Sequence, residues 1–305
     1  MMKNRQDYAC AVRRGDGSIA LDVQKYVSLP EKYPVLGLPL LRGVFSFADS
    51  MILGMRSLNW SAEIYAESAG EEEEEPSAFE KWLDEKFGEK AEKVVMGVVM
   101  AFSFVLAICI FMLLPMFLST LLKKVIPNEY LVALLEGVLR ISIFIIYIKL
   151  ISRMEDIRRT FMYHGAEHKC INCVEHGLPL TVENVMKSSK EHKRCGTSFI
   201  LIVMLISILF FMVIRTDTIL MRAVSRIVLI PVIAGVSYEF LRWTGTHDSL
   251  LVTVLSRPGM WMQGLTTKEP TPDMAEVAIK AVEAVFDWRA YLKENFGWQE
   301  QEEKA

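Results

Sequence analysis

The chain has 305 residues, of which 52% are hydrophobic and 23% are charged, and its formal net charge is -3. This composition excludes a disordered chain, a collagen-like chain and a small disulfide-stapled protein. A nearly neutral balance gives no reason to expect a nucleic-acid partner. The mean hydropathy is +0.27, which beside an ordinary number of charges indicates that charged residues are segregated from long apolar segments.

The N-terminal region contains two short β-prone runs, residues 8–12 and 19–23, which flank a turn with Asp16 and Gly17. An Asp-Gly pair between such runs is typical of a β-hairpin. We therefore expect a small hairpin within residues 1–32.

Residues 38–58 have the pattern of an amphipathic helix. The apolar face consists of Leu41, Val44, Phe45, Ala48, Met51, Ile52 and Met55, and the other face carries Arg42, Ser46, Asp49 and Arg56. Such a helix lies on a membrane surface or covers a helical bundle, and both interpretations stay open. A run of glutamates at 71–75, followed by Pro76, predicts a solvated linker, and residues 77–93 predict a charged helix.

Four apolar segments predict transmembrane helices. Residues 94–122 contain no charge, and about 20 residues are enough to cross a bilayer. Pro115 is expected to kink this helix. Residues 131–152, 197–214 and 223–240 follow, and a buried or re-entrant helix is the alternative for the last segment. The predicted fold class is mainly α: a polytopic membrane protein with about four transmembrane helices, amphipathic interfacial helices and the hairpin.

Lys and Arg are concentrated in the loop after the second segment. This loop contains Arg153, Arg158, Arg159, Lys169, Lys187, Lys190, Lys193 and Arg194, whereas the first connection offers only Lys123 and Lys124. Because cytoplasmic loops carry an excess of Lys and Arg, both termini and the middle loop are predicted to be cytoplasmic. The expected location is the bacterial cytoplasmic membrane.

Some charges fall inside the apolar segments. Glu136 and Arg140 are four residues apart on the second segment, and Glu239 and Arg242 lie near the end of the fourth. Charged residues are costly in lipid and usually face a bundle interior or a wet cavity. They either neutralise one another and fix the packing, or line a polar path.

The C-terminal region is expected to break at Pro258. Thr271 and Pro272 then predict the start of a helix. The apolar stripe of that helix, which we expect to pack in a core, consists of Val277, Ala278, Ala281, Val282 and Val285.

Histidine and cysteine are clustered between positions 164 and 195. The chain has five of each, and the cluster contains His164, His168, His176, His192, Cys170, Cys173 and Cys195. Imidazole and thiolate are favoured ligands of zinc and related metals. On a helix, His164 and His168 share one face. With Glu167 they match the H-x-x-E-H pattern of the inverzincin metallopeptidases, in which the glutamate is the base.

A third ligand is expected from a returning helix. If the helix with His164 continues the second span and stops near Gly177, a helix that begins at Thr181 brings His192 back to the same level. The predicted metal ligands are therefore His164, His168 and His192, with Cys195 as a fourth. Glu167 is the predicted base, and Arg194 is predicted to steady an anionic group. The implied cofactor is a divalent metal, with zinc the first choice.

Two other interpretations of the cluster stay open. Cys170 and Cys173 form a C-x-x-C pair that, with Cys195 and one histidine, could hold a structural zinc ion. In the third interpretation the histidines lie on the surface, the cysteines are buried and there is no metal.

Several motifs resemble one known family. They are Tyr-His-Gly-Ala-Glu-His-Lys at 163–169, Leu-Thr-Val-Glu-Asn-Val at 180–185, His-Lys-Arg-Cys-Gly-Thr-Ser-Phe at 192–199, Leu-Arg-Gly-Val at 41–44 and Leu-Thr-Thr-Lys-Glu-Pro at 265–270. Together they resemble the YqhQ-like family of bacterial membrane proteins, which is defined by a domain of unknown function. The resemblance covers essentially the whole chain and implies a multi-span membrane protein described as a metal-dependent enzyme.

The chain departs from the family pattern at Lys193, where members typically have proline. Cys170 and Cys173 lie outside that pattern, which favours a site built on His164, Glu167, His168 and His192. Members usually have a further segment ahead of the position of Met1, so we expect that this sequence starts later than those of other members and lacks that segment.

The predicted organisation follows the chain. Residues 1–32 form the hairpin, 33–60 the amphipathic helix, 61–93 the linker and charged helix, 94–152 the first two spans, 153–196 the cytoplasmic loop, 197–243 the other spans and 244–305 a cytoplasmic segment with an amphipathic helix. The leading hypothesis is a zinc-type metal-dependent hydrolase at the inner face of the membrane, acting on a lipid or a membrane peptide. The alternative is a non-enzymatic protein that senses or transports a metal, or a membrane scaffold.

Overall fold

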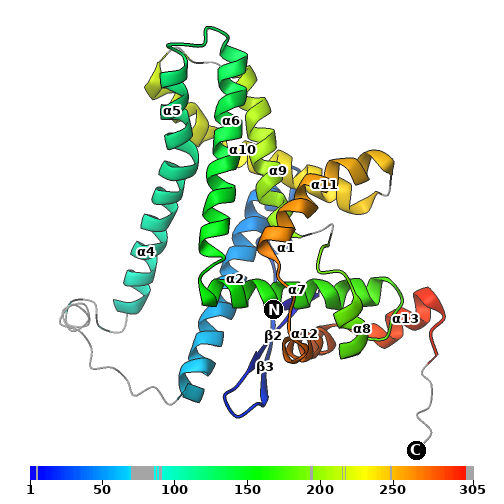
Figure 1. The fold of residues 1–305 in the computed structure, drawn as a ribbon. Coiled ribbons are helices and arrows are strands. Elements are labelled where there is room, and N and C mark those ends of the chain that lie inside the picture. Colours follow the sequence, from blue (N-terminus) through cyan, green and yellow to red (C-terminus); the bar gives the residue numbers. More distant parts are fainter. Residues whose placement is uncertain are drawn as a thin grey trace, which may run out of the picture.

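The computed structural model describes residues 1–4, 6–69, 86, 88, 91–192, 195–214, 216, 218–247 and 249–299. The predicted glutamate linker, most of the charged helix at 77–93, and Arg194 lie outside these residues. The described part consists of helices and one small sheet (Figure 1).

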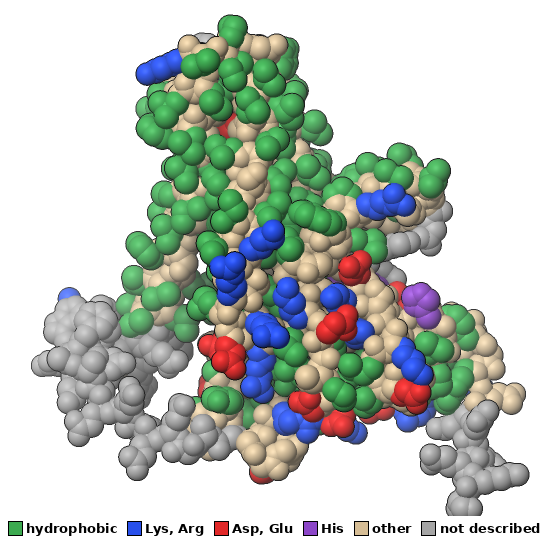
Figure 2. Space-filling view, in the orientation of Figure 1, with side chains coloured by type: hydrophobic (Ala, Val, Ile, Leu, Met, Phe, Trp, Pro, Cys, Tyr) green, Lys and Arg blue, Asp and Glu red, His purple; other side chains and the backbone are tan. Residues whose placement is uncertain are grey.

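Four helices are long and apolar enough to cross a membrane: Val94–Leu122, Glu129–Ile151, Gly196–Val213 and Ile219–Thr246. They match the four predicted segments, and the fourth is one continuous helix, α10 (Ile219–Thr246), that runs through Pro231. Hydrophobic side chains cover most of the upper part of the molecule, whereas most charged side chains gather below (Figure 2). The protein is therefore a polytopic membrane protein, as predicted.

The first span is distorted at the predicted proline. Helix α4 (Ala91–Ile108) passes into a π-helical turn (η3, Cys109–Leu113) and then into α5 (Leu114–Leu122), which has Pro115 in its first turn. Proline has no N–H to donate and its ring displaces the carbonyl four residues earlier. The wider π-turn accommodates both effects without ending the span.

The charges inside the bundle are paired with one another. Glu136 of α6 (Glu129–Ile151) accepts hydrogen bonds from Arg140 and, with both carboxylate oxygens, from Arg226 of α10. Arg140 also donates to the Ser207 hydroxyl of α9 (Gly196–Val213) at 2.6 Å. These contacts join three spans, so the packing interpretation of the membrane charges is the one that the structure supports.

Helix α2 (Leu41–Ala69) packs beside α10 and then leaves the bundle (Figure 1). The Arg42 guanidinium pairs with Glu239. A Cβ atom on Gly43 would lie 2.6 Å from that of Tyr238, so the two helices approach closely at this glycine. Three residues of the predicted apolar face of α2, Leu41, Met51 and Ile52, are each more than 40% exposed, and the other four are partly buried.

A crosswise helix lies under the spans. Helix α6 ends at Ile151, and α7 (Glu155–Glu175) turns away from it and runs across the base of the bundle (Figure 1). The expectation that α7 continues the second span is therefore wrong, because the turn at Ser152–Met154 redirects the chain. Gly177, with φ of 76°, follows the C-cap of α7, and Thr181 caps the short helix α8 (Val182–Lys187), both as predicted.

The sheet lies at the same end of the molecule. Strands β2 (Asp7–Arg13) and β3 (Ile19–Lys25) form the predicted antiparallel hairpin, with Ala9 opposite Val23. A further strand, β1 (Met2–Asn4), pairs with β2. Two short turns follow, α1 (Leu29–Lys32) and η1 (Pro34–Gly37).

The C-terminal helices are α11 (Leu250–Thr266), α12 (Pro272–Val285) and α13 (Trp288–Phe296). Pro258 lies inside α11, so the expected break there is wrong. Gly259 faces Ser198 so closely that a Cβ atom would lie 2.8 Å from the serine side chain, and this packing supports α11 across the proline. Helix α12 begins after Thr271 as predicted. Of its predicted stripe, Ala278 and Val282 pack in a core with Ala166, Cys170 and Cys173 of α7, whereas Val277 and Ala281 line a cavity.

Candidate metal centre

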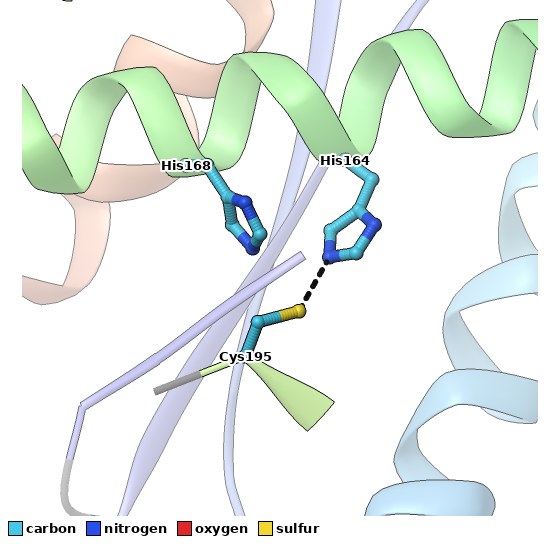
Figure 3. A group of neighbouring side chains, drawn as sticks. All are labelled: His164, His168 and Cys195. Atoms are coloured by element: carbon cyan, nitrogen blue, oxygen red, sulfur yellow. Dashed lines mark hydrogen bonds between the residues drawn. The ribbon is translucent and has the colours of Figure 1, made fainter. Parts of the chain in front are cut away.

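Two side chains of α7 and one from the start of α9 converge between these helices. His164 and His168 project from one face of α7, and Cys195 is the N-cap residue of α9 (Figure 3). Their candidate ligand atoms all lie within 4.8 Å of one another, and the Cys195 Sγ is 3.3 Å from the His164 Nε2. His168 and Cys195 are buried, whereas His164 is partly exposed.

Backbone carbonyl groups orient both imidazole rings. The Nδ1 of His164 is 3.3 Å from the Thr266 carbonyl oxygen, and the Nδ1 of His168 is 2.7 Å from that of Lys190. A carbonyl oxygen only accepts, so each Nδ1 carries the proton in the tautomer that this network assigns. Each Nε2 then carries a lone pair and no proton, which is the arrangement that carbonyl partners give to metal-binding histidines.

The environment of Cys195 favours its thiolate. Burial raises the pKa of this thiol, but the nearby His168 and the hydrogen bonds from Thr197 outweigh that effect, so the net pKa is lowered. The Thr197 N–H points to the Cys195 Sγ at 3.4 Å, in the first turn of α9. The helix N-terminus adds a partial positive charge at the same place.

The three donors fit a metal ion of the zinc type. Two imidazoles and one thiolate belong to the ligand set that zinc prefers. With Zn–S of about 2.3 Å and Zn–N of about 2.0 Å, a tetrahedral ion separates sulfur and nitrogen by about 3.5 Å. The observed 3.3 Å between the Cys195 Sγ and the His164 Nε2 is close to that separation. Three protein ligands would leave a fourth position for water or a substrate, as in catalytic zinc sites.

Gly165 lets the segment that carries the Thr266 carbonyl group approach His164. The segment after α11 passes against α7 at this residue, where the Lys268 N–H donates to the Phe161 carbonyl oxygen at 3.0 Å. A Cβ atom on Gly165 would collide with the Lys268 carbonyl oxygen. The glycine in the middle of the histidine motif therefore allows the contact that positions Thr266 next to His164.

His192 approaches the site but is not one of the three converging groups. Its ring lies 6.0 Å from that of His168, centroid to centroid, and its Nε2 is 3.0 Å from a Glu175 carboxylate oxygen. The backbone N–H and carbonyl of His192 are both held by the fully buried Gln263 side chain. The geometry thus brings together three of the four predicted ligands.

Glu167 projects from α7 toward a neighbouring cavity. Its carboxylate pairs with the α-amino group of Met1, and both Glu167 and His164 line a cavity of about 600 Å³. The predicted base is thus on the wall that His164 shares with the cavity. Arg194 lies outside the described residues, so its predicted role stays a prediction.

Cys170 and Cys173 lie away from the three converging side chains. Both are fully buried in the core between α7 and α12, and burial raises the pKa of each thiol. The Cys173 thiol donates to the carbonyl oxygens of Leu178 and Pro179. Protonated thiols in an apolar core are poor metal ligands, which weighs against the structural zinc interpretation.

Sequence reasoning did not identify the residues that support the site. Thr266 and Lys190 act through backbone carbonyls, which no side-chain pattern reveals. Gln263 fixes the chain at His192 and also donates to Ser198 at 2.8 Å. The one available signal was the motif at 265–270, which contains Thr266 and Lys268.

Comparison with known proteins gives a family but no reaction. Residues 38–288 match the family described as "Protein of unknown function (DUF1385)". The chain is 34% identical, over 97% of its own length and 92% of the relative's, to "Uncharacterized protein YqhQ" from Bacillus subtilis (strain 168). No solved structure matches. Neither description specifies an activity or a metal, and from the extent of both matches we conclude that the chain belongs to the DUF1385 family.

Proposed function

We propose that this protein is a metal-dependent hydrolase of the bacterial cytoplasmic membrane, with its site on the cytoplasmic face. His164, His168 and Cys195 hold a divalent metal of the zinc type. The observation that carries the proposal is the pair of carbonyl contacts at the two Nδ1 atoms, because they place the proton on Nδ1 and leave a lone pair on each Nε2 beside the Cys195 sulfur. The excess of Lys and Arg in the middle loop supports the cytoplasmic side.

Glu167 is the proposed base. A divalent metal held by His164, His168 and Cys195 would supply an activated water and would polarise a substrate carbonyl. Glu167 is three residues from His164 on α7, and both side chains border the same cavity. A carboxylate there can accept a proton from a water molecule that lies between the cavity and the ligands. Arg194 keeps its proposed role of steadying an anionic group.

The metal content of the purified full-length protein tests the ligand set. We expect about one metal ion per chain in the wild type, and a large loss in His164→Ala, His168→Ala and Cys195→Ser. His176→Ala is the matched control, because His176 belongs to the same loop but its Nδ1 bonds the Asn172 carbonyl. Metal content that is unchanged in all three ligand variants would overturn the proposal.

Hydrolysis is tested separately with p-nitrophenyl decanoate and Glu167→Gln. The proposal expects this variant to keep its metal and lose activity by at least a hundredfold, the size of a general-base contribution. A variant that keeps both metal and activity would remove Glu167 as the base. A protein that binds metal and hydrolyses none of a panel of acyl esters would favour the sensing or transporting alternative.

A second candidate is a cysteine nucleophile. The Cys195 Sγ lies 3.3 Å from the His164 Nε2, and the pKa of this thiol is lowered, with burial opposing and His168 and Thr197 favouring the thiolate. A thiolate beside an imidazole, with the ring oriented by a third group, is the arrangement of nucleophilic catalysis. Activity that survives complete metal removal but is lost in Cys195→Ser would favour this candidate over the metal.

A further inference from the structure

The cavity beside the candidate site has two unlike walls. It measures about 600 Å³ and lies between β2, α2, α7 and α12. This size is within the range of ligand pockets, about 300–1,000 Å³. The wall formed by α2 and α12 is mostly apolar and includes Leu58, Ala62, Ala278 and Ala281. The wall formed by α7 is polar and leads to His164 and Glu167.

The apolar wall is continuous with the exposed stripe of α2. Residues 51, 55, 58, 62 and 65 follow one another at helical spacing on that helix. Met51, Leu58 and Tyr65 are 46%, 56% and 60% exposed, and the last two line the cavity. Helix α2 begins beside the membrane span α10, so this stripe runs along α2 from the bundle toward the cavity (Figure 1).

Besides Glu167, which pairs with the Met1 α-amino group, the polar wall carries one charge of each sign. Asp156 and Arg159 lie one turn apart near the start of α7, and both line the cavity. Neither side chain is among the ion pairs found in the part of the chain that the structure describes. Two unpaired opposite charges on one wall are complementary to a ligand that itself carries both an anionic and a cationic group.

We propose that the cavity binds a single-chain zwitterionic amphiphile of the lysophospholipid class, taken from the adjoining membrane leaflet. Its acyl chain lies along Leu58, Ala62 and Ala281, its phosphate meets Arg159, and its amine meets Asp156. Its ester bond then lies toward His164 and Glu167. The inference names the substrate class of the proposed hydrolase and rests on that function for the reaction, although not for the binding.

Photo-crosslinking tests the binding without any turnover. Full-length protein in phosphatidylcholine nanodiscs is irradiated with a lysophosphatidylethanolamine that carries a diazirine near the middle of its chain, and the labelled peptides are identified by mass spectrometry. We expect labels on residues 58–65 and 277–281. Ala62→Trp, which fills the cavity, should lower this labelling at least tenfold. Labels confined to the four spans would overturn the proposal.

Charge variants test the headgroup contacts. Arg159→Gln and Asp156→Asn should each lower cavity labelling at least fivefold. The adjacent controls Arg158→Gln and Glu155→Gln, which are also exposed but do not line the cavity, should not change it. Equal labelling in all four variants would overturn the charge assignment. An unlabelled fatty acid that reduces the labelling as well as unlabelled lysophospholipid does would overturn the assignment of a zwitterionic ligand. A hydrophobic peptide that reduces the labelling more than either lipid would overturn the lipid class in favour of a peptide ligand.

Parallel metal analysis keeps the two proposals separable. If labelling of the cavity persists in Cys195→Ser and the metal content is unchanged by the three ligand substitutions, the amphiphile site is supported and the metal site is overturned. If the metal is lost as proposed but the cavity is never labelled, the metal site stands and this inference falls.

Discussion

Gly165 lies directly against the backbone of Lys268, so closely that a Cβ atom on the glycine would overlap the Lys268 carbonyl oxygen. The contact joins the histidine motif on α7 to the segment that follows α11. Thr266, two residues earlier in that segment, presents its carbonyl oxygen to the Nδ1 of His164. The orientation of a candidate metal ligand therefore depends on the absence of a side chain at the next residue.

Gly165→Ala should disturb the site without touching a ligand. The added methyl group meets backbone, which cannot rotate away, and overpacking of this kind costs about 1–3 kcal/mol. We expect a lower unfolding temperature and a reduced metal affinity. Gly264→Ala is the control, because nothing lies within 4 Å of its Cβ position. Equal stability and metal content in the two variants would show that the Lys268 backbone moves away without loss of stability, which would contradict the prediction.

Glu136→Gln should destabilise the bundle strongly. Glu136 is 3% exposed and receives hydrogen bonds from two buried arginines. Removing one partner from a buried ion pair costs about 3–5 kcal/mol, because the remaining charge is left uncompensated. Thermal unfolding in detergent measures the loss. The exposed Glu129→Gln, whose carboxylate faces Lys123 at 3.4 Å, should change the stability by no more than about 1 kcal/mol, and a similar loss in both variants would contradict the assignment.

Cys195 should be alkylated at lower pH than an ordinary thiol in metal-free protein. Burial raises its pKa, but His168 and Thr197 lower it by more, so the thiolate forms below the usual range. The rate of labelling by iodoacetamide, followed by mass spectrometry, should reach half of its maximum below pH 9. Thr197→Ala should move that midpoint upward. Cys173 should stay unlabelled, because burial raises its pKa, and a Cys195 midpoint no lower than that of a free thiol would contradict the prediction.

Tyr26 should make the sheet end of the molecule sensitive to alkali. Burial and the hydrogen bond that its hydroxyl donates to Asp49 raise the pKa of Tyr26 to about 12. The unfolded value is about 10, so the folded state retains the proton longer. This contribution to stability is complete below about pH 10 and is lost as the pH rises toward 12.

Tyr26→Phe tests this dependence by unfolding at pH 9 and pH 11.5. The variant should be less stable than the wild type at pH 9, by about 1 kcal/mol for the lost hydrogen bond. The difference should shrink at pH 11.5, because the wild type has begun to lose the same contribution. Tyr33→Phe, at a half-exposed tyrosine, is the control. A difference that stays constant between the two pH values would exclude Tyr26 as the titrating group.

Local signals in the sequence were enough for the elements. Apolar length predicted the four spans, the Asp-Gly pair predicted the hairpin, and Thr181 and Thr271 marked helix starts that the structure contains. Each of these signals acts within one element, between residues a few positions apart. The same spacing rule places His164 and His168 on one face of α7, since helical geometry alone fixes that pair.

Only the tertiary structure decided which residue joins the two histidines. The turn at Ser152–Met154 sends α7 across the base of the bundle, so that α7 does not run on in the direction of the second span. The first turn of α9, with Cys195, then meets the histidine face, while Gln263 and Glu175 hold His192 to one side. In the same way, Glu136 binds Arg226, which is 90 positions away. Such contacts depend on how whole helices cross and fill space, which a short stretch of sequence does not encode.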